Sequence, residues 1–347
     1  AAIPNPSPAG VYALGIPAKH KISRNEAFDI NRDAWYNLTP MLTEREGFAV
    51  VCTEGKIYIA GGNDGTGILA SAEVLDLTTS AWTELPAMSS TRYLPAAVAV
   101  NGQICVLAGA DSDRDALDSC EAFDISVGAW SQLPPLPTRR KDFGVAAVDG
   151  KIYAAGGKCD TDILCSFEAF QVDTRAWSKL PPLPAKRDPL SVAVAGEVLY
   201  ACGGLTGFDC CHASVHVFDI AGSTWSQLPH MITRRIDCGM VELAGRIYAF
   251  GGYDGVRCLA SMEMFDPDKQ SWQLLPSMSV KRRGLATAVR EGRIYALGGV
   301  DVYAGVTKPL ATAEVFDPET GWKSLPSLTT EGIAIPLAVD GCHLVTS

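Results

Sequence analysis

The chain contains 347 residues, of which 47% are hydrophobic, and it carries a formal net charge of −10 at pH 7. This hydrophobic share is ample for a large core, yet no run of about 18 apolar residues occurs, so the sequence predicts no membrane-spanning helix. The acidic balance argues against non-specific nucleic-acid binding, which needs a basic surface to displace counterions.

The first complete unit of the chain, residues 45–88, reads as four short strands. Two apolar runs come first, and the turn Glu54-Gly55 separates them. The second run ends at Gly61-Gly62, and Leu85-Pro86 ends the unit because proline cannot donate to a β-ladder. Strands bounded by Gly, Asp and Pro turn signals predict one antiparallel meander. The expected strands cover residues 47–53, 56–60, 71–77 and a last segment beginning at Trp82.

The same order of residues returns along the rest of the chain. The seven tryptophans are spaced by 47, 48, 47, 48, 47 and 50 residues, at Trp35, Trp82, Trp130, Trp177, Trp225, Trp272 and Trp322. A glycine pair recurs as Gly61-Gly62, Gly156-Gly157, Gly203-Gly204, Gly251-Gly252 and Gly298-Gly299, with Ala108-Gly109 as a degenerate copy. A glutamate lies eight or nine residues before six of the tryptophans, at Glu26, Glu73, Glu121, Glu168, Glu263 and Glu314, and His216 takes this place once. A fixed period near 50 predicts a repeat architecture, and all-strand units predict a β-propeller.

Gly-Gly, then Glu-x-Phe-Asp, then Trp resembles the Kelch repeat, and the resemblance covers nearly the whole chain. One departure is Phe where the Kelch pattern usually has Tyr, which removes a hydroxyl group but keeps the ring. The resemblance implies an all-β propeller in which each repeat forms one four-stranded antiparallel blade and the first strand is innermost.

We therefore predict one domain over residues 1–347, a seven-bladed Kelch β-propeller. A six-bladed ring is the alternative, and the seven tryptophans argue against it. The C-terminal piece 332–339 supplies the strand that the N-terminal piece lacks, so pairing them removes open edges. Residues 342–345 compete with residues 11–14 for one place in that blade, and we expect 11–14 to take it. The repeats are expected at 11–41 (completed by 332–339), 45–88, 92–136, 140–183, 187–231, 235–278 and 282–328.

An arginine lies 16 residues before each glycine pair, at Arg45, Arg92, Arg140, Arg187, Arg235 and Arg282. The seventh equivalent position is Glu331. Strand alternation places these arginines on the face that also carries the loops between second and third strands, near the mouth of the central channel. Guanidinium groups bind carboxylate and phosphate with two parallel donors. The resemblance implies the same use, because Kelch adaptors of ubiquitin ligases bind acidic degrons with arginines at this phase.

A scaffold role for the six arginines is the alternative. Each would then pair with a nearby carboxylate (Glu46, Asp142, Asp188 or Asp237) or with carbonyl groups of its blade. Further basic residues flank the series at Arg139, Lys141, Lys186, Arg234, Lys281 and Arg283.

We predict a non-catalytic protein-interaction module, a scaffold or adaptor that binds an acidic or phosphorylated segment of a protein partner through the arginine-bearing face. The alternatives are a propeller enzyme or small-molecule binder at the channel mouth, and a structural subunit of a large assembly. The glutamates recur in six copies, which indicates a structural hydrogen-bonding role rather than catalysis. We expect no cofactor and no metal, because the loop residues Cys159, Cys165, Cys210-Cys211-His212 and Cys258 lack CxxC spacing.

The eleven cysteines are odd in number and share no phase of the repeat. Cys52, Cys105 and Cys202 fall in expected strands, where a free cysteine behaves as a small hydrophobic residue. This is a poor disulfide framework, so we expect free thiols and a cytoplasmic location. The chain begins Ala1-Ala2-Ile3 without Met, which fits Met excision, a removed targeting peptide or a fragment of a longer protein.

Overall fold

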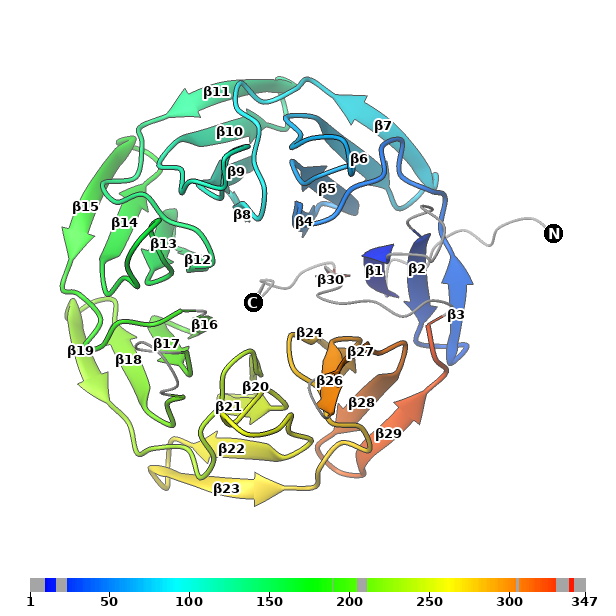
Figure 1. Ribbon diagram of the computed structural model, residues 1–347, viewed down its shortest axis with the longest axis vertical. Coiled ribbons are helices and arrows are strands. Elements are labelled where there is room, and N and C mark those ends of the chain that lie inside the picture. The colour runs from blue at the N-terminus through cyan, green and yellow to red at the C-terminus, as the bar shows by residue number, and fades with distance from the viewer. Residues whose placement is uncertain are drawn as a thin grey trace.

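The computed structural model describes residues 10–16, 24–188, 190–204, 211–303, 306–328 and 337–339. These residues form seven four-stranded antiparallel sheets arranged in a ring around a central axis (Figure 1). The prediction of a seven-bladed propeller is confirmed, and the six-bladed alternative is wrong. None of the described residues lies in a helix.

In each blade the strands follow one another outward from the axis to the rim, as Figure 1 shows. Blade 1 contains β4 (Ala49–Thr53), β5 (Lys56–Ala60), β6 (Ala72–Asp76) and β7 (Ala81–Leu85). Blade 2 contains β8 (Ala96–Val100), β9 (Gln103–Leu107), β10 (Cys120–Asp124) and β11 (Ala129–Leu133). Blade 3 contains β12 (Gly144–Val148), β13 (Lys151–Ala155), β14 (Phe167–Gln171) and β15 (Ala176–Leu180).

The next three blades repeat this plan. Blade 4 contains β16 (Ser191–Ala195), β17 (Val198–Cys202), β18 (Val215–Asp219) and β19 (Thr224–Gln227). Blade 5 contains β20 (Gly239–Leu243), β21 (Arg246–Phe250), β22 (Met262–Asp266) and β23 (Ser271–Leu275). Blade 6 contains β24 (Ala286–Arg290), β25 (Arg293–Leu297), β28 (Ala313–Asp317) and β29 (Gly321–Leu325). A separate hairpin of β26 (Val300–Tyr303) and β27 (Val306–Pro309) is inserted between β25 and β28.

Blade 7 closes the ring with strands from both ends of the chain. It contains β30 (Leu337–Val339), β1 (Gly10–Ile16), β2 (Arg24–Asp29) and β3 (Ala34–Asn37). Val11 pairs with Val339 and Ala13 with Leu337, so β1 takes the second place in the blade, as the sequence predicted. The competing segment 342–345 lies outside the described residues.

The glycine pairs have a steric cause that blade 1 shows well. Gly61 and Gly62 have φ angles of 72° and 95°, in the left-handed region that favours glycine. A Cβ atom on Gly61 would lie 2.6 Å from the carbonyl oxygen of Arg92 in the next link, and one on Gly62 would lie 2.7 Å from that of Glu46. The pairs thus let neighbouring segments of the chain pass close to the end of each second strand.

Six of the seven tryptophans join their blade to the blade before it by an indole hydrogen bond, whereas the buried indole N–H of Trp322 makes none within the described residues. Trp177 packs against Phe170 of its own blade in a tilted arrangement, with ring centroids 5.1 Å apart, and its indole N–H donates to the carbonyl of Pro134 at 2.9 Å. Equivalent bonds join Trp35 to Pro326, Trp82 to Thr39, Trp130 to Pro86, Trp225 to Pro181 and Trp272 to Pro229. The indole rings are therefore part of the scaffold.

Candidate functional site

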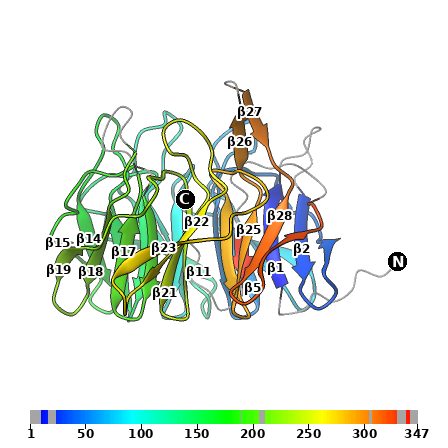
Figure 2. The same cartoon turned by 90° about the horizontal axis from the view of Figure 1, so that it is seen from below.

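The two ends of the ring differ in structure. One end, here called the link face, carries the links between blades (such as 86–95) and the loops between second and third strands (such as 61–71). Bridges such as Lys141 with Lys158 and Ile236 with Tyr253 join a link to the loop of its own blade, so both lie on one face, as expected. The β26–β27 hairpin projects from this face at the top of Figure 2.

The opposite end, here called the turn face, consists of tight turns. At Glu54-Gly55 both central residues have positive φ angles, 52° and 70°, the signature of a two-residue hairpin turn. The turn between third and fourth strands is closed by an aspartate. Asp76, for example, accepts hydrogen bonds from the backbone N–H groups of Thr78 and Thr79.

The six arginines predicted to bind a partner lie inside the protein. Arg45 is 3% exposed, and the other five are 0% exposed. Arg235 shows the arrangement: its guanidinium group donates to the carbonyls of Gly251 and Ser261 at 2.7 and 2.9 Å, and to the Glu263 carboxylate at 2.8 Å. Buried ion pairs of the same kind join Arg45 to Glu73, Arg92 to Glu121, Arg140 to Glu168 and Arg282 to Glu314.

The glutamate of each pair also accepts hydrogen bonds from the link between blades. Glu263 accepts hydrogen bonds from the backbone N–H groups of Ile232 and Thr233, at 2.6 and 3.0 Å. Burial lowers the pKa of Arg45, Arg140, Arg187 and Arg282. At Arg140 the charge and hydrogen bond of Glu168 oppose this shift. Arginine nevertheless stays charged in proteins. Each pair therefore ties a link, a glycine turn and a third strand together.

This geometry favours the scaffold role over direct contact between these arginines and a partner, because the six side chains are buried and a partner could not reach them. The carbonyl partners are those considered for a scaffold, but the carboxylate partner is the third-strand glutamate and not Glu46, Asp142, Asp188 or Asp237. The signal in the sequence was that arginine and glutamate recur together in the same repeats. Glu331 lies outside the described residues.

Blade 4 departs from the rule because His216 replaces the glutamate. Arg187 lies 2.8 Å from the Nδ1 of His216 and donates to the Ser214 hydroxyl at 2.7 Å and to the Gly203 carbonyl. Burial, followed by the charge of Arg187, lowers the pKa of His216 to about 4. The imidazole is therefore neutral at pH 7, and no ion pair joins Arg187 to a carboxylate among the described residues.

One group of half-buried charged side chains lies on the link face, beside the innermost strands. Lys158 lies 2.8 Å from the Asp142 carboxylate and 3.5 Å from that of Asp188, while Arg283 lies 4.0 Å from Asp237. Burial raises the pKa of Asp188 and of Asp237, against the opposing charges of Lys158 and Arg283. This part of the face is polar and of mixed charge.

Aromatic rings and further cations surround this centre. Arg283 lies over the ring of Tyr253, and Arg114 over that of Tyr93, with the guanidinium carbon 5.2 and 5.7 Å from the ring centroids. Farther out, Arg139 is paired with Asp118 at 3.5 Å. Lys141 is likewise paired with Asp160, and Lys186 with Asp162. The flanking basic residues are thus more accessible than the six arginines, but several already have carboxylate partners.

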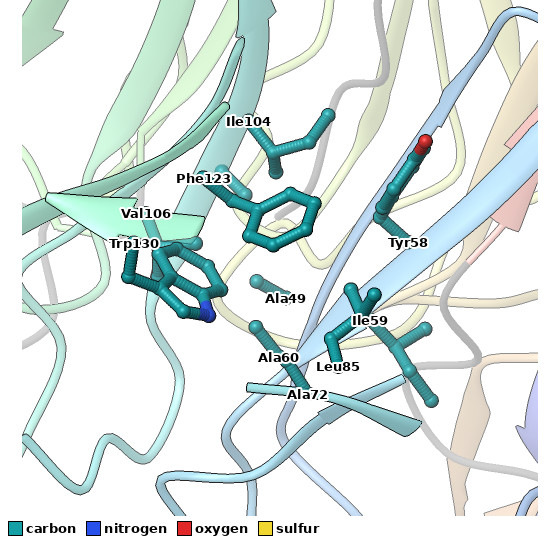
Figure 3. Close-up of a pocket in the computed structure, with 11 residues that line it drawn as sticks. Ala49, Tyr58, Ile59, Ala60, Ala72, Leu85, Ile104, Val106, Phe123 and Trp130 are labelled. Carbon is teal, nitrogen blue, oxygen red and sulfur yellow. The ribbon is translucent and has the colours of Figure 1, made fainter. Parts of the chain in front are cut away.

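The gap between blades 1 and 2 is too small for a ligand. Figure 3 shows Phe123 and Trp130 facing Tyr58 and several alanines across it. Its volume is about 10 Å³, the room for a single water molecule, and its walls are apolar. It is a packing defect between blades, left by small residues such as Ala60 and Ala72.

Neither a metal centre nor a membrane span is visible in the part of the chain that the structure describes. It holds no group of three or more His, Cys, Asp or Glu side chains arranged to bind a metal ion, and no helix suited to crossing a membrane. Of the loop cysteines singled out from the sequence, Cys159, Cys165 and Cys258 are free thiols. Cys211 is partly buried, and Cys210 lies outside the described residues.

Comparison with known proteins agrees with the fold. The KLHDC2/KLHL20/DRC7 Kelch-repeats domain matches residues 47–237, which is more than half of the chain. The chain belongs to the Kelch-repeat family. The Kelch motif matches two further segments of this Kelch protein, residues 234–279 and 281–329.

Relatives resemble parts of this Kelch chain. Kelch-like protein 40 of Mus musculus is 29% identical over 99 residues, which cover 28% of this chain and 16% of the relative. An F-box/kelch-repeat protein of Arabidopsis thaliana is 32% identical over 117 residues, covering 28% and 25%. The matched region thus spans a quarter or less of these relatives. The solved structure of YjhT superposes with a TM-score of 0.64 at 13% identity, covering 83% of this chain and 99% of that one, which shows a shared fold.

Proposed function

We propose that residues 1–347 form one non-catalytic protein-interaction domain, a scaffold or adaptor that binds its partner on the link face. The observation that carries this proposal is the contrast between the two ends of the ring. The turn face is built from minimal turns, whereas the link face presents longer loops, half-buried charges, aromatic rings and the projecting β26–β27 hairpin. Similarity to Kelch-like and F-box/kelch-repeat proteins supports an interaction role.

We still propose an acidic or phosphorylated segment as the ligand. The residues that would contact it are not the six buried arginines. The exposed cations Arg139 and Lys186, 64% and 44% exposed at their side chains, replace the buried arginines as the expected contacts. Arg234 and Lys281 are also exposed on the links. A partner carboxylate or phosphate would displace the present partners Asp118 and Asp162. Such surface pairing weakens as salt rises.

A charge-matched pair of double variants tests the proposal. The chain captures its partner from cell extract, the partner is purified, and its Kd is measured. Arg139→Ala with Lys186→Ala should weaken binding about tenfold, or ~1.4 kcal/mol, because each of the two rim contacts contributes up to ~1 kcal/mol. Arg246→Ala with Arg293→Ala removes the same charge from exposed positions on the turn face and should leave the Kd unchanged. Equal loss in both variants, or loss only in the turn-face variant, would refute the choice of face.

A cytoplasmic location stays part of the proposal. Its support is that Cys105, Cys120 and Cys258 are free thiols buried in the core, where a thiol serves as a small core residue.

A further inference from the structure

Three sulfur atoms meet in the core at the boundary between blades 4 and 5. Cys202 ends β17, Cys238 immediately precedes β20, and Met240 lies within β20. The Cys202 Sγ lies 3.0 Å from the Met240 Sδ, and the Cys202 and Cys238 thiols are hydrogen-bonded to each other. The three residues are 0%, 2% and 0% exposed. Two thiols and a thioether thus share one site from which water is excluded.

The charge next to these sulfur atoms sets this site apart from the other blades. Arg187 donates to the carbonyl of Gly203, the residue after Cys202, and its charge acts on the Cys202 thiol. In the other blades with this arginine, a glutamate balances the buried guanidinium charge, whereas in blade 4 the neutral His216 stands in that place. A buried charge without a counter-charge is costly. The site therefore suits an occupant that brings one negative charge.

We propose that Cys202, Cys238 and Met240 bind one monovalent soft metal ion, with Cu(I) as the expected ion. Thiolate and thioether sulfur are the ligands that Cu(I) prefers in proteins. On binding, each thiol releases its proton to solvent, and the ion is held by two thiolates and one thioether without any change of oxidation state. The resulting complex carries one negative charge, which Arg187 balances. Asp237, partly exposed near the axis, lies one residue from Cys238, so solvent is close to one side of the site.

An anaerobic titration of the reduced, full-length chain tests the site. Cu(I) is added in competition with a chromophoric Cu(I) chelator, and Ag(I) is used as a redox-inert probe. One ion should bind to the wild-type chain against the chelator, and Cys238→Ser should abolish this binding. Met240→Leu conserves the side-chain volume and therefore folds, and it should weaken binding about tenfold. The copper X-ray absorption spectrum should report three sulfur neighbours in the wild type and two in Met240→Leu.

Two further variants separate a metal site from core packing. His216→Glu leaves the three sulfur ligands themselves unchanged but supplies the missing counter-charge, so it should weaken Cu(I) binding about tenfold, as changes outside the ligand shell do. Cys105→Ser removes a thiol from another buried pair, Cys105 and Cys120, for which the described residues show no hydrogen bond to a methionine sulfur, and it should bind as the wild type does. Wild-type affinity in Met240→Leu and His216→Glu would overturn the proposal. Equal loss in Cys105→Ser would also overturn it, because the ion would then lie elsewhere.

Discussion

Removing one buried arginine should destabilise the fold far more than removing its exposed neighbour. Arg235→Ala deletes the donors that hold the carbonyls of Gly251 and Ser261 and leaves the carboxylate of Glu263, 0% exposed, without its counter-ion. Breaking a buried pair from one side costs about 3–5 kcal/mol of unfolding free energy. Arg234→Ala changes an exposed side chain, and its effect should stay within about 0.5 kcal/mol.

Urea unfolding of the two variants, followed by tryptophan fluorescence and circular dichroism, measures this difference. Arg235→Lys adds a graded step, because lysine keeps the charge but lacks the planar fork that reaches two carbonyls and a carboxylate together. We expect its loss to lie between those of the alanine variants. If the unfolding free energies of Arg235→Ala and Arg234→Ala differ by less than about 0.5 kcal/mol, the buried pairs do not stabilise the links, and the scaffold account is wrong.

Three other predictions follow from blade 4, the tryptophans and the cysteines. The pKa of His216 is about 4 in the folded state, below the usual value near 6.5, so the unfolded chain takes up the proton first. Stability should therefore fall between pH 6.5 and 4, by at most ~1.4 kcal/mol per pH unit from this residue, and His216→Gln should flatten that slope. Trp177→Ala should cost about 3–5 kcal/mol in a urea titration, and an unchanged midpoint would remove the indole from the scaffold. Thiol counting in denaturant without reductant should return nearly all eleven cysteines, whereas recovery of half or fewer would indicate disulfides and an oxidising compartment.

The fold could be predicted because each blade repeats the same local signals. The tryptophan interval, the glycine pairs and the Glu54-Gly55 type of turn set strand order, and the spacing from 11–14 to Glu26 set the closure. The burial of the arginines could not be predicted in the same way. A residue that recurs at one phase has the same periodicity whether it points inward to Glu263 or outward to a partner, and only the side-chain environment distinguishes the two.

Features found in a single blade were harder to predict than repeated ones. The sequence identifies His216 as a substitute for glutamate, but its consequence for Arg187 depends on which groups surround the guanidinium. The β26–β27 hairpin lies in a loop that is only a few residues longer than its counterparts. Cys202 is distant in sequence from Cys238 and Met240, and only the packing of blade 4 against blade 5 brings its sulfur atom to theirs.

The central claim is that the buried arginines hold the ring while the link face receives the partner, and hydrogen–deuterium exchange tests it most directly. Exchange is compared for the chain alone and in complex with its purified partner. Protection should appear in link-face segments, such as residues 108–119 and 156–166, with the turns at 53–56 and 149–151 unchanged. Protection confined to the turn face or to the outermost strands would contradict the account.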